Sequence, residues 1–347
     1  GIKGRATGVV FPTSKSELSK VVGFARSHNL TLVPRGAGTN TIGGCVPEGS
    51  YVVDMSKMNN IVEIGNDYVV VESGVILDHL NRALGGKFFP IEPDNNRSCT
   101  IGGMVAANSF GRRSKEYGRT ADWVISLDVI DGTGVHETIK DEKKLRHFIG
   151  MEGTTGIISR AKLKIIPRIE NKRTYNLLSF NTMTAMVEKV KDLLQDLNVT
   201  YIEYWDEFVS DMVCIDCKNH LFIEYDDDSG LIKSEDEISH LWNVKDKIDT
   251  TMRSLGFIDT ESPQVPLQSM DKYLYWLKKN KIPTVAQFGT NLVTSYFKSK
   301  EIYRRECVQV ARGVGAKVHA TGVGMMRKEF LGKEDKERIA LIKKHYD

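Results

Sequence analysis

The chain has no long apolar run and few cysteines, and both absences narrow its class. No stretch of its 347 residues approaches the length of a membrane span, and no signal peptide is visible. Its five cysteines, an odd number at irregular spacing, do not form a disulfide framework. We therefore expect a protein of a reducing compartment, cytoplasmic or peripheral at the membrane.

The chain also lacks a large excess of charge of one sign, and it lacks cysteines and histidines at the spacing of metal ligands. The net charge is only +3, with lysine and arginine spread along the chain, so we expect no nucleic-acid partner. Cys214 and Cys217 form a single CxxC beside His220, but no second ligand pair accompanies them. The remaining histidines are scattered. We interpret the thiols as buried or incidental and expect no metal site.

Glycine, in contrast, is concentrated in particular segments. Residues 34–44 read PRGAGTNTIGG and follow the short apolar run Leu30–Val33. Such a segment lets backbone N–H groups converge on a phosphate anion. A surface turn, in which Gly36 and Gly38 supply positive φ angles, explains this one segment equally well.

Two further glycine-rich segments follow, Thr100–Ser109 and Glu152–Ile158. Together the three segments suit a long ligand with a pyrophosphate in its middle better than a lone phosphate. Gly36-Ala37-Gly38 is not followed by glycine at the GxGxxG spacing or by a helical pattern, which disfavours a Rossmann nicotinamide domain.

The pattern of the first half predicts short strands mixed with a few helices. A capping box from Ser14 to Glu17 opens a helix that ends near His28. The other expected elements are strands at Leu30–Val33, Tyr51–Met55, Ile61–Ile64, Tyr68–Glu72, Trp123–Ile130 and Gly156–Ile166, and a helix at Ile76–Leu84. This mixture indicates an α+β fold.

The charged stretch Arg168–Arg173 predicts a domain boundary. After it the pattern predicts a β-α-β-β-α order typical of a ferredoxin-like domain. The expected elements are strands at Thr174–Phe180, Thr200–Tyr204 and Leu221–Tyr225 and helices at Met183–Leu197 and from Ser234 to Leu255. A helix at Tyr296–Arg312, a strand at Ala316–Ala320 and a charged helix at Lys333–Tyr346 follow.

The ordered motifs PRGAGTNTIGG, TIGGMVAANSFGRRSKEYGRTADWV and EGTTGIISRAKLKIIP resemble the FAD domain of the vanillyl-alcohol-oxidase type of FAD-linked oxidases. The branch they resemble most is the D-lactate dehydrogenase and glycolate oxidase flavin-subunit group. The likeness covers residues 8–167, with a weaker tail at 319–345. It implies a PCMH-type FAD-binding domain of two α/β subdomains at residues 1–170, a ferredoxin-like cap at 171–320 and a returning segment at 321–347.

The resemblance implies FAD as the cofactor and assigns its contacts. These are Pro34, Arg35, Gly36, Ala37, Gly38, Thr39, Asn40, Thr41, Pro93, Thr100, Gly102, Gly103, Ala106, Asn108, Ser109, Gly111, Tyr117, Glu152, Gly156 and Ile158. Relatives with covalent flavin use a histidine in the first loop, where this chain has Asn40 and Thr41, so we expect non-covalent FAD. Cys99 is displaced from the second attachment position, and we interpret it as structural.

Three residues are the candidate catalytic groups. Lys245 stands where the family motif Trp-x-x-Arg-Glu has its arginine, and a solvated helix face is the alternative interpretation. In the C-terminal motif, Thr321 replaces the family histidine, while His319 lies two places earlier as a base or as a structural residue. Arg327 matches the family lysine and suits a carboxylate.

The function implied is oxidation of a D-2-hydroxy acid, of D-lactate or glycolate type, by hydride transfer to flavin N5. Electrons would then pass to a quinone, an iron–sulfur subunit or another acceptor. An alkyl-glycerone-phosphate synthase, a sugar oxidase and a non-catalytic flavin subunit of a larger complex stay open as alternatives. A homodimer is also left open.

Overall fold

The computed structural model describes residues 3–168, 173–298, 303–318, 322–324 and 331–346. The chain divides into two compact units. The first comprises residues 1–112, 117–168 and 322–347, and the second comprises residues 113–116 and 169–321. The short segment 113–116, flanked on both sides by the first unit, therefore belongs to the second.

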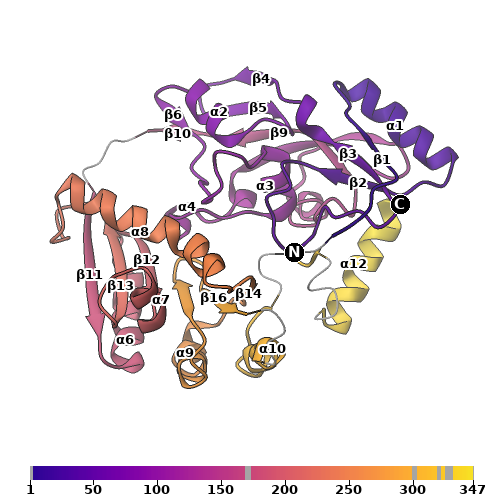
Figure 1. Cartoon of the computed structure of the whole chain (residues 1–347). Coiled ribbons are helices and arrows are strands. Elements are labelled where there is room, and N and C mark those ends of the chain that lie inside the picture. Colours follow the sequence, from indigo (N-terminus) through magenta and orange to yellow (C-terminus); the bar gives the residue numbers. More distant parts are fainter. Residues whose placement is uncertain (1–2, 169–172, 299–302, 319–321, 325–330, 347) are drawn as a thin grey trace. The chain divides into compact units, whose positions relative to one another are not determined.

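The first unit contains two main sheets (Figure 1). A parallel sheet has the order β1-β3-β2, and an antiparallel sheet has the order β4-β5-β9-β7-β8. A small β10-β6 pair accompanies them. The strands are β1 (Gly8–Val10), β2 (Leu32–Arg35), β3 (Tyr51–Asp54), β4 (Ile61–Ile64), β5 (Tyr68–Glu72), β6 (Lys87–Phe88), β7 (Val124–Ile130), β8 (His136–Ile139), β9 (Ile157–Lys164) and β10 (Ile166–Pro167).

Helices accompany these strands in the first unit. They are α1 (Lys15–Ser27), α2 (Leu77–Ala83), α3 (Ile101–Ala107), α5 (Glu142–Leu145) and α12 (Lys333–Tyr346), with α4 (Ser114–Tyr117) crossing into the second unit. The cap of α1 is as expected at Ser14, whose side chain accepts the Glu17 amide. The Glu17 carboxylate, however, accepts the amide of Thr13, 2.8 Å away, rather than that of Ser14.

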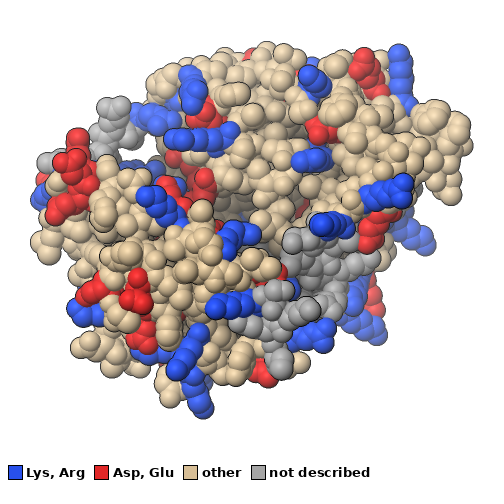
Figure 2. All heavy atoms as spheres, in the orientation of Figure 1, with Lys and Arg blue, Asp and Glu red and all other residues tan. Residues whose placement is uncertain are grey.

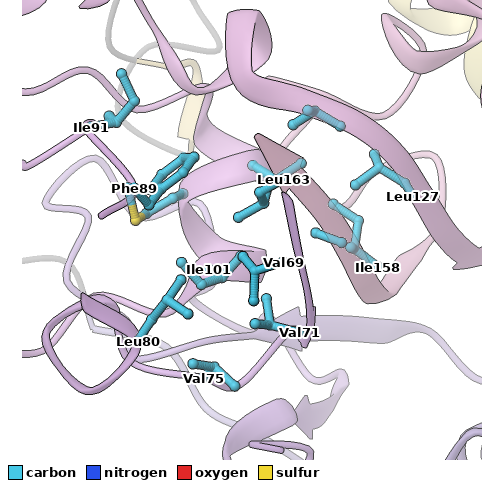
Figure 3. Packing of buried hydrophobic residues seen from close by; sticks show 14 of the residues in the cluster. Val69, Val71, Val75, Leu80, Phe89, Ile91, Ile101, Leu127, Ile158 and Leu163 are labelled. Atoms are coloured by element: carbon cyan, nitrogen blue, oxygen red, sulfur yellow. The ribbon is translucent and has the colours of Figure 1, made fainter. Parts of the chain in front are cut away.

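The core of the first unit lies between the antiparallel sheet and α3, which packs against β5 and β9. Figure 3 shows Ile101 of α3 and Ile158 of β9 among the side chains of this cluster, together with Val69, Val71 and Leu163. Burying such side chains contributes roughly 1.5–3 kcal/mol each. The core therefore holds in place the helix and the strand that carry two of the glycine-rich segments.

The second unit is built on one six-stranded antiparallel sheet of order β11-β13-β12-β15-β16-β14. Its elements are β11 (Thr174–Phe180), α6 (Met183–Gln195), β12 (Val199–Trp205), α7 (Glu207–Met212), β13 (Asn219–Tyr225), α8 (Glu235–Ser254), β14 (Asp259–Glu261), α9 (Met270–Lys279), β15 (Thr284–Gln287), β16 (Leu292–Phe297) and α10 (Tyr303–Gly313).

The strand order shows two similar halves. In the first, β11, β12 and β13 lie in the order first-third-second, and in the second, β14, β15 and β16 repeat this order. The halves join through β12 and β15, with Tyr204 opposite Ala286. The expected β-α-β-β-α order is therefore present, and a second copy of its βαββ core extends the sheet.

Helices cover both faces of this sheet. Tyr201 and Trp205 of β12 lie in one cluster with Leu241 of α8. Tyr204, between them in sequence, donates to the sulfur of Met183 at the start of α6. Because neighbouring strand residues point to opposite faces, α8 and α6 cover opposite faces of the sheet.

One expectation for this region is wrong. A helix was predicted from Tyr296 to Arg312, but Tyr296 and Phe297 end strand β16, and the helix α10 begins at Tyr303. Both aromatic residues are buried and paired with β14, an environment that favours strand over helix. Of the strand expected at Ala316–Ala320, Lys317 forms an isolated bridge with Gln264, and residues 319 and 320 lie outside the described residues.

Charges of both signs are interspersed on the face shown in Figure 2 rather than gathered by sign. This distribution agrees with the small net charge. Among the described residues, no helix is both long and apolar enough to cross a membrane.

Candidate functional site: three converging glycine-rich segments

The first segment leaves β2 and is partly open to solvent, whereas Ile42 near its end is buried. Arg35, Ala37, Gly38, Asn40 and Thr41 are exposed. Within the part of the chain that the structure describes, no acidic side chain forms an ion pair with Arg35. Exposed backbone beside a guanidinium without an acidic partner is an arrangement that attracts an anion.

Gly38 is required in this loop for two reasons. Its φ is +69°, in the left-handed region that favours glycine. A Cβ at this position would also lie 2.8 Å from the guanidinium nitrogens of Arg35, so the Arg35 side chain folds back over the loop. The cation therefore lies at the loop that was predicted to hold the pyrophosphate.

The second segment forms α3. Thr100 caps this helix by accepting the Gly103 amide at 3.3 Å, and Ile101 anchors the first turn in the core. Gly102 lies directly on Ser73, where a Cβ would be 2.5 Å from the Ser73 Cβ. The helix ends at Asn108, whose φ is 46° and whose Oδ1 accepts the Ala121 amide at 3.0 Å.

The third segment is a tight loop between α5 and β9. Gly150, Glu152 and Gly153 all have positive φ angles, of 74°, 53° and 74°. The buried hydroxyl of Thr155 donates to the carbonyl of His147 at 2.7 Å, which holds the loop against the preceding helical turn.

The three segments, distant in sequence, contact one another in pairs. A Cβ on Gly36 would lie 2.2 Å from the Thr100 hydroxyl, which joins the first segment to the second. A Cβ on Gly153 would lie 2.4 Å from Pro34, which joins the third to the first. The amide of Glu152 donates to the carbonyl of Ala106 at 2.9 Å, which joins the third to the second. The structure thus brings together the segments that the sequence predicted to share one ligand.

Other predicted cofactor contacts border this junction. Gly111 lies on the backbone beside Pro93, where a Cβ would be 2.5 Å from the Glu92 nitrogen. Tyr117 packs edge-on against Phe88 and Trp123. Contact of Gly111 and Tyr117 with the cofactor stays a prediction.

Two residues of the third segment, Gly156 and Ile158, can offer a ligand only their backbone. Ile158 is 7% exposed and lies in the core, opposite Val129 in the β7–β9 ladder. A Cβ on Gly156 would lie 2.9 Å from the Ile130 carbonyl oxygen. Any contact of Ile158 with a cofactor would therefore come from its main chain.

Glu152 has a role that the sequence did not indicate. Its carboxylate accepts hydrogen bonds from the backbone amides of Val323 and Gly324, the latter at 2.8 Å. The C-terminal Gly-x-Gly motif therefore lies at the junction of the three segments. The available signal was a glutamate that lies between Gly150 and Gly153 in a loop.

The candidate catalytic residues are only partly described. His319, Thr321 and Arg327 lie outside the described residues. Lys245 lies on α8 in the second unit, where its side chain is 8% exposed and its Nζ is 3.8 Å from the Asp246 carboxylate. The alternative of a solvated helix face is therefore wrong for Lys245, although Asp246 is 45% exposed.

The cysteines differ in environment. Burial raises the pKa of Cys99 to about 12, so its thiol stays protonated and unreactive at neutral pH. Cys214 and Cys217 are exposed, so of the two interpretations, buried or incidental thiols, the buried one is excluded for this pair. Among the described residues, no group of histidine, cysteine, aspartate and glutamate side chains is arranged to hold a metal ion.

A pocket of about 350 Å³ lies elsewhere on the first unit, beside α2. It is lined by Leu77, Asp78, Asn81, Arg82, Gly85, Glu92, Asn96 and Arg168. These residues include none of the predicted cofactor or catalytic residues.

Comparison with known proteins agrees with this geometry. Residues 6–140 match the family model described as an FAD binding domain. The chain is 35% identical over 201 residues to the glycolate oxidase subunit GlcD of Bacillus subtilis, covering 54% of this chain and 42% of that protein. It is 35% identical over 178 residues to a D-lactate dehydrogenase of Anaerostipes hadrus, covering 48% and 37%.

A third relative, D-2-hydroxyglutarate dehydrogenase of Pseudomonas putida, is 34% identical over 166 residues, covering 45% of this chain and 16% of that protein. The chain therefore spans less than half the length of each of these relatives. Among solved structures, an alkyldihydroxyacetonephosphate synthase superposes with a TM-score of 0.71 at 18% identity, covering 98% of this chain and 75% of that one. This likeness shows a shared fold.

Proposed function

We propose that the chain, whose residues 6–140 match the model of an FAD binding domain, is part of an FAD-dependent dehydrogenase that oxidises a D-2-hydroxy acid to the 2-oxo acid. The observation that carries the proposal is the pairwise contact of the three glycine-rich segments. The relatives' names point to glycolate, D-lactate and D-2-hydroxyglutarate. These compounds share a carboxylate beside a carbon that bears a hydroxyl group.

The residues around the junction fit FAD. Most of residues 35–41 are exposed and could offer backbone amides to a pyrophosphate, and the Arg35 side chain adds a cation at the same loop. Thr100 to Ser109 would border the other side of the cofactor. We therefore assign the pyrophosphate to the first segment.

The oxidation removes a hydride from C2 and a proton from the hydroxyl oxygen of the substrate. Bound FAD supplies the acceptor for the hydride. In our proposal Lys245 and Arg327 hold the substrate carboxylate, and His319 takes the hydroxyl proton. The electrons then leave to a quinone, an iron–sulfur subunit or another acceptor.

Two observations favour a second candidate, a flavin-binding subunit that works only within a complex. The relative from Bacillus subtilis is named as a subunit, and in this chain threonine stands at the family histidine position 321. Such a subunit would bind FAD but would not reduce it with substrate on its own.

Anaerobic titration of the FAD-loaded protein separates these candidates. We expect glycolate, D-lactate or D-2-hydroxyglutarate to bleach the flavin absorption band, and L-lactate to leave it unchanged. If dithionite bleaches the flavin but none of the 2-hydroxy acids does, the dehydrogenase proposal is wrong for this chain alone.

A further inference from the structure

The backbone of Glu152 adopts a conformation that costs less for glycine. Its φ of 53° lies in the left-handed region, between Gly150 and Gly153, which share that region. A side chain at such a position is strained, and strain of this kind persists where surrounding contacts offset it. The contacts of the Glu152 side chain therefore indicate its role.

Both carboxylate oxygens of Glu152 accept backbone amides of the C-terminal segment. Oε1 accepts the Val323 amide, and Oε2 accepts the Gly324 amide at 2.8 Å. Hydrogen bonds to an ionised carboxylate are stronger than those between neutral groups. Paired bonds from successive amides also fix the direction of the backbone that donates them.

The glycines on either side of Val323 make this approach possible. A Cβ on Gly322 would lie 2.4 Å from Oε1 of Glu152, and a Cβ on Gly324 would lie 2.2 Å from the carbonyl oxygen of Ile42. Their φ angles are 112° and 45°. Residues 322–324 are therefore packed between Glu152 and the end of the first glycine-rich segment.

Glu152 is itself attached to the rest of the junction. Its amide donates to the Ala106 carbonyl at 2.9 Å, and a Cβ on Gly44 would lie 2.9 Å from its Oε2. One residue thus contacts the first and second segments and the C-terminal motif while belonging to the third.

The far end of the C-terminal segment is also fixed near the third segment. Tyr346 is 5% exposed, and its carbonyl accepts the Gly132 amide at 2.7 Å. Its hydroxyl lies 3.1 Å from Nδ1 of His147, and its ring packs against Phe148. The C-terminal segment is therefore held at both described ends within the first unit.

We propose that Glu152 is a positioning residue that couples the C-terminal segment 322–324 to the junction of the three glycine-rich segments, the FAD cradle. It acts by holding these two amides against the first glycine-rich segment, in place of the direct FAD contact that the family resemblance implies for Glu152. This role depends on FAD binding and not on the identity of the hydroxy acid. If the chain oxidised no hydroxy acid, the proposed role of Glu152 would therefore still hold.

Hydrogen exchange of the apoprotein tests the contact without any catalysis. We expect the Val323 and Gly324 amides to be protected in the wild type and to exchange at least about tenfold faster in Glu152→Gln, which presents NH₂ to one of the donors. Glu152→Gly removes the carboxylate and relieves the strained left-handed backbone at the same time. Faster exchange of the two amides in this variant would therefore report the lost contact and not a folding defect. Glu142→Gln, at an exposed glutamate, is the control and should change neither amide.

A double-mutant cycle tests the coupling to FAD. Gly322→Ala places a Cβ on the Glu152 carboxylate and disrupts the same contact from the other side. We expect Glu152→Gln and Gly322→Ala each to weaken FAD binding about tenfold and the double variant to be no weaker than the worse single variant. Gly86→Ala, where a Cβ meets open space, should bind FAD as the wild type does.

Two results would overturn the proposal. Additive losses of affinity would mean that Glu152 contacts FAD independently of the C-terminal segment. If Glu152→Gln releases the Val323 and Gly324 amides but binds FAD as tightly as the wild type, segment 322–324 is not coupled to the cradle.

Discussion

Arg113 and Glu224 form a bidentate ion pair, with Nε 2.8 Å from Oε1 and Nη2 3.1 Å from Oε2. The same carboxylate, whose side chain is fully buried, accepts from Arg173 at 2.7 Å, from the Tyr175 hydroxyl at 2.8 Å and from the Thr200 hydroxyl at 2.6 Å. Arg113 stands in a motif that the sequence assigned to the FAD domain, yet it stabilises the second unit.

This pair predicts acid sensitivity. Burial raises the pKa of Glu224, but the hydrogen bond and charge of Arg113, the charge of Arg173 and the Thr200 hydroxyl outweigh it and lower the pKa from 4.5 to about 2. Because the folded pKa lies below the unfolded value, the ionised carboxylate adds stability above about pH 4.5 that is lost as the pH falls towards about 2.

The measurement is the midpoint of urea unfolding as a function of pH, monitored by tryptophan fluorescence. We expect Glu224→Gln to be less stable at neutral pH by about 3 kcal/mol, because it leaves two partly buried arginines without their carboxylate. The free energy of unfolding of Glu224→Gln should also change less than that of the wild type between about pH 4.5 and about pH 2. The exposed Glu235→Gln serves as control. Parallel pH profiles for Glu224→Gln and the wild type would contradict the assignment.

Gly36→Ala should weaken FAD binding, because the new methyl group would lie 2.2 Å from the Thr100 hydroxyl and push the first two segments apart. We expect a loss of about tenfold in affinity, measured by titrating the apoprotein with FAD. Thr100→Ala removes the obstructing oxygen and costs about 1 kcal/mol of helix capping. The double variant should recover affinity over Gly36→Ala; no recovery would show that the crowding lies elsewhere.

Arg35→Ala should lower FAD affinity about tenfold or more and make the remaining affinity less sensitive to salt, because a charge-assisted bond to phosphate is lost. Arg35→Lys should retain part of the affinity, since it keeps the charge but not the planar geometry. Arg146→Ala, at an arginine whose side chain is 75% exposed, is the matched control. Equal affinities for Arg35→Ala and the wild type would remove Arg35 from the phosphate site.

Lys245→Met keeps the volume of a buried side chain and removes its charge. If Lys245 holds the substrate carboxylate, kcat/KM for flavin reduction should fall about ten- to a hundredfold with FAD content unchanged, and Arg327→Ala should behave alike. Lys247→Met, at an exposed position of the same helix, is the control. Wild-type rates of flavin reduction in both variants would show that the carboxylate is bound elsewhere.

Chelation should leave activity unchanged. Hydride transfer to FAD requires no metal, and the described residues contain no group arranged to bind one. The measurement is flavin reduction before and after dialysis against EDTA, together with elemental analysis. About one zinc or manganese per chain, lost together with activity, would contradict this expectation.

The sequence by itself determined the elements whose signals are local. The hairpin strands Ile61–Ile64 and Tyr68–Glu72, the strand Thr174–Phe180 and the helix Lys333–Tyr346 were predicted with the bounds that the structure has. Alternation, turn residues and helical periodicity act over a few neighbouring residues. The glycine-rich segments were likewise recognised from the sequence, because left-handed conformations such as that of Gly38 are ones that glycine adopts readily.

Only the tertiary structure decided which distant residues meet. The Glu152 contact with Gly324, the pair of Arg113 with Glu224 and the repetition of one strand order in two halves of a sheet join residues far apart in sequence. A glutamate in a glycine loop or an arginine after a helix has no local pattern that names its partner. The partner is set by the path of the whole chain, because side-chain contacts reach only a few ångströms and depend on how every intervening element packs.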